Sequence, residues 1–110
     1  MIKAGRSLET SLLDKDDWYD LLTCSIVRQA VEEFRYYLKR LSMTSSFGVI
    51  QHLKSELIGL VNFFNSQWYE TISPINRDVL CWQLRQELKK YLIKHKEHEK
   101  FLMENIMEEL

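Results

Sequence analysis

Apolar residues recur every three or four positions along most of the chain, which is the period of one face of an α-helix. The first such stripe follows Asp14, a residue that can cap a helix N-terminus and that precedes two further acidic residues suited to the first turn. The stripe consists of Trp18, Leu22, Ile26, Ala30, Phe34, Leu38 and Leu41. The opposite face carries Arg28, Glu32, Arg35 and Lys39. Their spacing allows ion pairs within one long amphipathic helix.

A second stripe follows the segment from Ser42 to Ser46, whose length suits a connection between two antiparallel helices. This second helix is expected from about Phe47 to Gln67. Its main stripe is Ile50, Leu53, Leu57, Leu60, Val61, Phe64 and Trp68, and it is widened by Phe47, Ile58 and Phe63. A helix so broadly apolar is usually central in its bundle. Gly59 costs this helix about 1 kcal/mol relative to Ala, and we expect the close approach of a neighbouring helix to compensate.

The start signals for a third helix are Ser73 before Pro74 and, in competition with them, Asn76 with Asp78. More than 30 residues then follow without Gly or Pro, so the helix is expected to continue to the C-terminus. Its first half is apolar at Val79, Leu80, Leu84, Leu88, Tyr91 and Leu92. Its second half is more polar. The predicted fold is therefore all-α, a three-helix bundle with a long C-terminal helix that extends beyond the core.

A chain of 110 residues fits a single domain. We divide it into a flexible N-terminal arm (residues 1–13), a helical bundle domain (residues 14–92) and a C-terminal helical extension (residues 93–110). The residues expected to be largely buried are Trp18, Leu22, Ile26, Phe34, Leu53, Leu57, Leu60, Phe64, Leu80, Leu84 and Leu88.

Charge and cysteine usage narrow the class of protein. The 15 basic and 16 acidic residues nearly cancel, which argues against a strongly basic nucleic-acid binder and against an acidic mimic of nucleic acid. Cys24 and Cys81 lie far apart among apolar residues and are expected to be reduced, buried thiols. The N-terminus lacks an apolar signal-peptide region, and the stretch from Ile58 to Phe64 is too short to span a bilayer. We expect a cytoplasmic protein with no membrane partner.

One part of the third helix is locally basic and is our candidate for a partner-binding surface. Its cations are Arg85, Lys89, Lys90, Lys94, Lys96 and Lys100. Cations interleaved with aromatic residues, here Trp82 and Tyr91, can follow a phosphate backbone. Acidic residues interrupt the run, however, and lysine-rich helix faces are common for solubility alone.

His95, His98 and Glu99 have the i, i+3, i+4 spacing at which side chains of one helix can hold a divalent ion. The segment is not an HExxH motif and no second ligand cluster accompanies it, so we expect structural histidines and no metal or cofactor. The sequence also lacks a Gly-rich phosphate loop, a GxSxG motif and a paired acid motif. We therefore expect a protein that is not an enzyme.

The extension also suggests self-association, because a recurring apolar stripe beyond the core needs a cover. A two-fold homodimer would let each extension cover the other. The predicted interface residues are Tyr91, Leu92, His95, His98, Leu102 and Ile106. Protonation of the histidines below about pH 6.5 would then weaken the dimer. The alternatives are that the extension folds back onto its own bundle or docks on another protein.

Three segments in this order carry a resemblance: Asp17–Leu22 followed by Ala30–Lys39, then Phe63–Ile72, then Leu80–Leu88. Together they resemble a group of small, mostly uncharacterised helical accessory proteins from phages and prophages of Gram-positive bacteria. The resemblance covers about residues 16–90, and the chain departs from the group at residues 73–77 and after Lys90. It carries over no catalytic residue.

The resemblance implies a phage or prophage accessory protein that acts by protein–protein binding. Its partner would be a host protein, for example a defence nuclease such as a CRISPR effector, which it would inhibit in the cytoplasm of the bacterial host. The alternative function, which comes from the residues alone, is a nucleic-acid-binding accessory factor that uses the basic face of the third helix.

Overall fold

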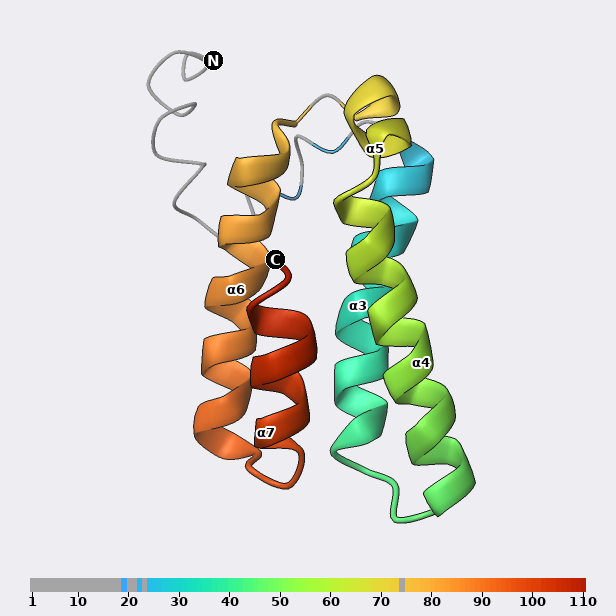
Figure 1. The fold of residues 1–110 in the computed structure, drawn as a ribbon, viewed down its shortest axis with the longest axis vertical. Helices are drawn as coiled ribbons and strands as arrows, with labels where there is room; N and C mark the ends of the chain where they lie inside the picture. The colour runs from blue at the N-terminus through green and yellow to red at the C-terminus, as the bar shows by residue number, and fades with distance from the viewer. Residues whose placement is uncertain (1–18, 20–21, 23, 74) are drawn as a thin grey trace.

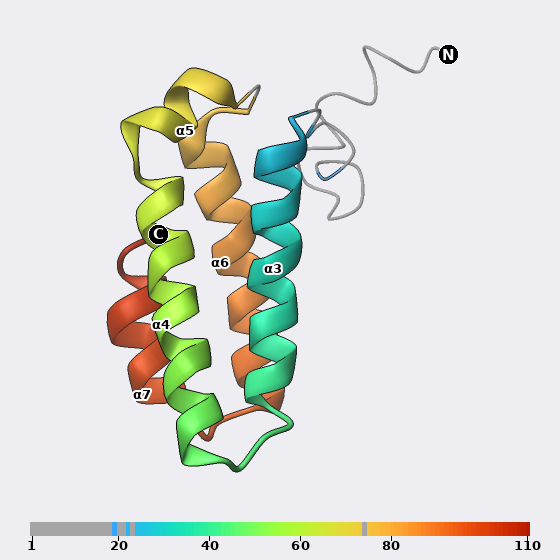
Figure 2. The same ribbon diagram turned by 90° about the vertical axis from the view of Figure 1, so that its right-hand side faces the viewer.

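The computed structural model describes residues 19, 22, 24–73 and 75–110, and this part of the chain is helical and contains no strand. The elements are α3 (Ser25–Leu41), α4 (Phe47–Phe64), α5 (Gln67–Ile72), α6 (Arg77–Lys94), α7 (Glu99–Leu102) and the π-helix η1 (Met103–Met107), which continues α7 directly. Helices α3, α4, α6 and the α7–η1 segment lie side by side along one axis, and the short α5 closes one end (Figures 1 and 2). The all-α prediction is confirmed.

Helix α3 follows the predicted stripe only in part, and the predicted start near Asp14, like Trp18, lies outside the described residues. The buried residues of α3 are Val27, Ala30, Val31, Phe34, Leu38 and Leu41. Ile26 is 46% exposed, so its predicted burial is wrong, and Val27 takes its place. The reason is that strict i+4 spacing drifts around a helix of 3.6 residues per turn. Relative to Phe34, Val27 lies about 20° away around the axis and Ile26 about 80° away.

Helix α4 begins at Phe47 as predicted but ends at Phe64, before the predicted end at Gln67. The hydroxyl of Ser66 accepts a hydrogen bond from the backbone N–H of Tyr69 (3.1 Å) and caps the short helix α5. This turn buries Tyr69, whose hydroxyl donates to the carbonyl of Ile75 (2.9 Å). Trp68, predicted to close the α4 stripe, is therefore exposed on α5.

Two further expectations for α4 are wrong. Its flanking residues Phe47 and Ile58 are exposed, so the apolar stripe is narrower than predicted. Gly59 is exposed as well, and a Cβ atom built on it would meet nothing within 4 Å. The predicted close approach of a neighbouring helix at Gly59 is therefore absent.

The predicted long C-terminal helix is replaced by a helical hairpin. Helix α6 starts at the competing signal, where the side chain of Asn76 accepts from the backbone N–H of Asp78 (2.7 Å), and it ends at Lys94. Residues 95–98 form a turn, and α7–η1 runs back along α6 (Figure 1). At the end of this return, the side-chain amide of Asn65 in the α4–α5 connection donates to the carbonyl of Glu109 (2.7 Å).

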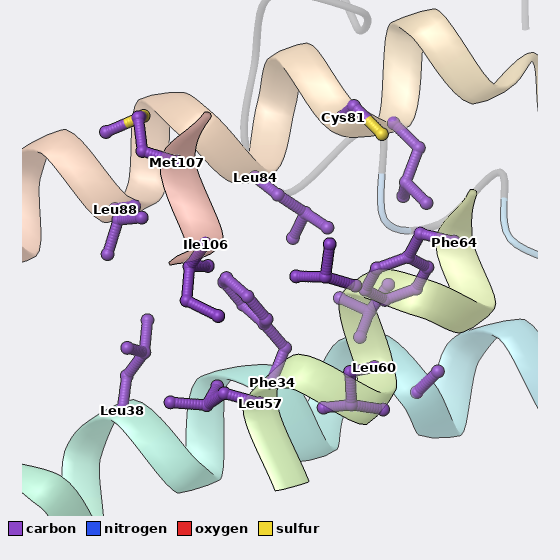
Figure 3. Close-up of a cluster of buried hydrophobic side chains, with 14 of the residues drawn as sticks. Phe34, Leu38, Leu57, Leu60, Phe64, Cys81, Leu84, Leu88, Ile106 and Met107 are labelled. Carbon is purple, nitrogen blue, oxygen red and sulfur yellow. The ribbon is translucent and has the colours of Figure 1, made fainter. Parts of the chain in front are cut away.

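The chain reverses here because residues 94–100 contain no apolar side chain. A straight helix would have carried Leu102, Ile106 and Met107 into solvent, whereas the hairpin buries all three in the core. Ile106 lies between two groups of side chains (Figure 3). Leu84 and Leu88 of α6 are on one side of it, and Phe34 of α3 and Leu57 of α4 are on the other. The predicted three-helix bundle with a long C-terminal helix that extends beyond the core is thus corrected: the third helix ends at Lys94, and residues 99–107 return to pack in the same core.

The core itself was largely predictable. The predicted residues that are buried are Leu22, Phe34, Leu53, Leu57, Leu60, Phe64, Leu80, Leu84 and Leu88. They meet in one continuous cluster to which α3, α4, α6 and η1 all contribute (Figure 3). The rings of Phe34 and Phe64 pack edge to face at a centroid distance of 6.4 Å and link α3 to α4.

Candidate partner-binding site

An open groove of about 620 Å³ lies between the C-terminal halves of α3 and α6. We call it the basic groove. Its lining residues are Arg35, Leu38, Lys39, Ser42, Glu87, Lys90, Tyr91, Ile93, Lys94 and His95.

An ion pair connects the two helices within the basic groove. The Arg35 guanidinium donates to the Glu87 carboxylate twice, from Nε to Oε1 (2.9 Å) and from Nη2 to Oε2 (2.7 Å). Arg35 was expected to pair within α3, but the structure shows this cross-helix pair. Its bidentate geometry is the strong form of an arginine–carboxylate interaction, and Glu87 is mostly buried. Since these two charges offset each other, Lys39, Lys90 and Lys94 give the groove its net positive charge.

Tyr91 and His95 form an aromatic wall one helical turn apart, with ring centroids separated by 4.7 Å. Burial raises the pKa of the Tyr91 phenol, and Glu97 adds to this, while a hydrogen bond with Ser42 acts in the opposite direction. The Tyr91 hydroxyl therefore stays neutral at physiological pH. A neutral phenol beside lysines can donate a hydrogen bond to an anionic ligand.

The structure divides the predicted basic surface instead of gathering it. Successive residues of a helix point about 100° apart, so the adjacent Lys89 and Lys90 face different sides of α6. Lys90 and Lys94 line the basic groove, whereas the helical spacing turns Arg85 and Lys89 by about 100° or more away from Lys90. The remaining two predicted cations lie elsewhere: Lys96 is in the turn after α6, and Lys100 is on α7.

Sequence reasoning missed the contribution of α3 to this site. Arg35 and Lys39 were placed correctly on the polar face of their helix, but nothing in the sequence showed that this face adjoins α6. The sequence does contain two pairs of cations, each four residues apart: Arg35 with Lys39 on α3, and Lys90 with Lys94 on α6. This similarity could have suggested that the two pairs belong to one site.

The residues assigned to a homodimer interface have other positions. Leu92, Leu102 and Ile106 are buried in the chain's own core, so the apolar stripe that motivated the dimer is covered within one molecule. Tyr91 and His95 line the basic groove. His98 is half-buried at the start of α7, and its pKa is lowered by burial and by the charge of Lys54, against a smaller opposing effect of Glu97.

The histidines and cysteines form no shared site in the described part of the chain. His95 and His98 stand at opposite ends of the α6–α7 turn, so the helical i, i+3, i+4 arrangement with Glu99 does not occur. Among the residues that the structure describes, no group of three or more His, Cys, Asp or Glu side chains could hold a metal ion. Cys24 and Cys81 are free thiols, half-buried and buried respectively.

Large apolar side chains are exposed at the same end of the bundle as the basic groove. Met43 is 69% exposed in the α3–α4 connection, Phe47 is 75% exposed at the start of α4, and Ile93 is 73% exposed near the end of α6. Both connections, residues 42–46 and 95–98, lie at this end, at the bottom of Figure 1. This end therefore combines cations with apolar side chains that pack poorly against the chain itself.

Within residues 19, 22, 24–73 and 75–110, no helix has the length and apolar character needed to cross a membrane. The chain matches no protein-family model, no curated protein and no solved structure. What the protein binds must therefore be inferred from the basic groove and the side chains around it.

Proposed function

We propose that the protein is a phage or prophage accessory protein that binds a host protein through the basic groove and modulates it in the cytoplasm of the bacterial host. The observation that carries the proposal is the convergence of Lys39, Lys90 and Lys94 on one open groove beside exposed apolar side chains. The resemblance over residues 16–90 supports the phage origin. A defence nuclease such as a CRISPR effector is the kind of host protein that this origin suggests.

The composition of this end of the bundle favours a protein partner over a nucleic acid. Protein interfaces are enriched in methionine, aromatic residues and arginine at their centre and are polar at the rim. Met43, Phe47 and Ile93 supply such apolar anchors. A nucleic-acid backbone instead needs cations arranged along a continuous track, and Arg85 and Lys89 lie on a different side of α6 from the groove lysines.

Charge also restricts which surface of a partner can dock. The basic groove complements an acidic segment, and electrostatic complementarity of this kind gives specificity and a faster association rate. The channel in which a nuclease holds nucleic acid is positively charged. If the partner is a nuclease, the groove would therefore bind an acidic surface of it and would not act by mimicking its substrate.

The homodimer expected from the sequence forms no part of this proposal. Leu92, Leu102 and Ile106, half of its assigned interface, are buried in the core of one chain.

The test is a pull-down with the tagged full chain from a nuclease-treated lysate of a Gram-positive bacterium. We expect one protein to be retained in stoichiometric amount by the wild type and lost with Lys39→Glu, which reverses a groove charge on α3. Lys100→Glu makes the same charge change on α7 and serves as the control, which should retain the partner. Loss of all partners on nuclease treatment would support the nucleic-acid alternative. Equal retention by both variants would show that the groove is not the site.

A further inference from the structure

A second depression lies on the other flank of α3, between α3 and α4, with a volume of about 330 Å³. We call it the aromatic pocket. Its lining residues are Tyr36, Tyr37, Arg40, Gly48, Val49, His52 and Leu53. It differs from the basic groove in that aromatic rings and a glycine, and not lysines, form most of its surface.

The two sites share the last two turns of α3. Arg35 and Lys39 face the basic groove, while Tyr36 and Arg40, each the next residue along, face the aromatic pocket. Between the two sites stands one exposed ridge of α3, which includes Tyr36 and Lys39. A single partner segment that crosses this ridge would reach both sites.

The walls of the aromatic pocket are held in place by contacts within the chain. The Arg40 guanidinium donates to the Tyr36 hydroxyl (3.0 Å) and lies over the Tyr36 ring, 5.8 Å from its centroid. The rings of Tyr36 and Tyr37 meet edge to face at 5.7 Å. Burial raises the pKa of Tyr37, as do the nearby carboxylates of Glu33 and Glu56. The pocket therefore presents two tyrosine rings with Arg40 at its edge, and the carboxylates of Glu33 and Glu56 lie near the Tyr37 side.

Gly48, in the first turn of α4, is one of the residues that line the pocket. It is exposed, and a Cβ atom built on it would meet nothing within 4 Å, so a larger side chain has room at this position. An open pocket lined by aromatic rings suits a single inserted apolar side chain, because burying such a side chain removes apolar area from water.

We propose that the aromatic pocket binds one apolar side chain of the same acidic segment that occupies the basic groove. This inference rests on the proposed function and adds the chemistry of the partner segment to it. Charge complementarity with the basic groove and with Lys39 on the ridge makes the segment acidic, whereas Glu33 and Glu56 near Tyr37 disfavour a second acidic side chain in the pocket and favour an apolar one. Exposed ion pairs contribute little alone, whereas an anchor in a pocket contributes a large share of binding energy.

The inference is tested with two fluorescent, glutamate-rich peptides that are identical except at one central position, which is leucine in one and serine in the other. The full chain is titrated with each. We expect the leucine peptide to bind about tenfold or more tightly than the serine peptide, which corresponds to at least about 1.4 kcal/mol. Equal affinity of the two peptides would overturn the anchor.

The chain offers a matched pair of variants for blocking the pocket. Gly48→Phe fills the aromatic pocket, whereas Gly59→Phe makes the same change at another exposed glycine of α4 with equal free space. We expect Gly48→Phe to abolish the difference between the two peptides and Gly59→Phe to preserve it. Tyr36→Ala, which removes an exposed wall, should act as Gly48→Phe does. A thermal melt of each variant verifies that it is folded.

A further variant, Lys90→Glu, separates failure of this inference from failure of the proposed function. Lys90→Glu should weaken both peptides, because both use the basic groove. If Lys90→Glu weakens both but Gly48→Phe leaves the leucine preference intact, the anchor is wrong and the docking function stands. If neither peptide binds, or if Lys90→Glu has no effect, the proposed function and the anchor are both overturned.

Discussion

The hairpin of α3 and α4 and the C-terminal hairpin of α6 with α7–η1 contribute to the same core, but α4 carries far fewer charges than α6. Helix α4 has two charged side chains, Lys54 and Glu56, whereas α6 of the same length has seven: Arg77, Asp78, Arg85, Glu87, Lys89, Lys90 and Lys94. Both nevertheless bury a leucine stripe. The core therefore needs only one apolar face from each helix. The remaining positions determine where the chain turns and which side chains are exposed to a partner.

The two hairpins also turn by different means. The α3–α4 connection contains serine and threonine, and the Ser42 hydroxyl donates to the carbonyl of Lys39 (2.7 Å). The α6–α7 turn contains neither Gly nor Pro and consists of charged and histidine side chains. It forms because a continued helix would leave the next apolar side chains in solvent, so tertiary packing, made possible by the wholly polar residues 94–100, determines this turn.

The largest expected effect comes from a charge in the N-terminal half of the core. Leu57 is fully buried on α4, so Leu57→Asp places an unpaired carboxylate among apolar groups. We expect a loss of about 4 kcal/mol or more, which is a large fraction of the stability of a domain of this size. Ser55→Asp, on the exposed side of the same helix, should change stability by about 0.5 kcal/mol or less. Urea unfolding followed by circular dichroism measures both, and an unchanged midpoint for Leu57→Asp would contradict the assigned face.

Truncating a single side chain tests whether the C-terminal hairpin packs on the core as the N-terminal hairpin does. Leu102 is fully buried, whereas its neighbour Met103 is exposed. We expect Leu102→Ala to cost about 2–4 kcal/mol, as for other core leucines, and Met103→Ala to cost about 0.5 kcal/mol or less. Urea unfolding of the two variants side by side gives the comparison. Equal, small effects would mean that residues 99–107 do not pack on the core.

Gly59 marks a position where α4 is not constrained by a neighbouring helix. Since a methyl group there would meet nothing within 4 Å, Gly59→Ala should gain helix propensity without a clash. We expect a stabilisation of about 0.5–1 kcal/mol, read as a higher melting temperature. A lower melting temperature would indicate a close helix contact at this glycine.

The smallest expected effect is a pH dependence of the folding stability that arises from His98 in the C-terminal hairpin. The pKa of His98 is lowered in the folded chain, mainly by burial, from an ordinary value of about 6.5. The unfolded chain then binds the proton more readily, so stability should fall as the pH drops below about 6.5. Unfolding measured over this range should show a shallower pH dependence for His98→Gln than for the wild type. His52→Gln, at an exposed histidine, is the control. Identical profiles for His98→Gln and the wild type would exclude His98 as the cause.

Helical periodicity was sufficient to predict the middle of each stripe. Leu53, Leu57, Leu84 and Leu88 recur at spacings that keep them on one face, and all are buried. The prediction failed where a run of i+4 steps drifted around the helix, as at Ile26, and where a cap was overlooked, as at Ser66. The period alone could not show that the helix after Arg77 would reverse.

The candidate site was less predictable than the core, because it depends on which helices are neighbours. Lys90 and Lys94 were identified from the local excess of basic residues. Their partners on α3, Arg35 and Lys39, are far away in sequence and meet them only in the folded bundle. The same reasoning grouped Lys89 with Lys90 by proximity in sequence, although the two side chains point about 100° apart.

That pair of adjacent lysines supplies the most direct test of the proposed docking site. Once the host partner has been captured, its affinity for the wild type, Lys90→Glu and Lys89→Glu is measured by titration calorimetry at one ionic strength. If the basic groove is the docking site, Lys90→Glu weakens binding about tenfold or more, which is about 1.4 kcal/mol, and Lys89→Glu stays close to the wild type. Equal weakening by both variants, or no weakening by Lys90→Glu, would contradict the assignment of the groove as the binding surface.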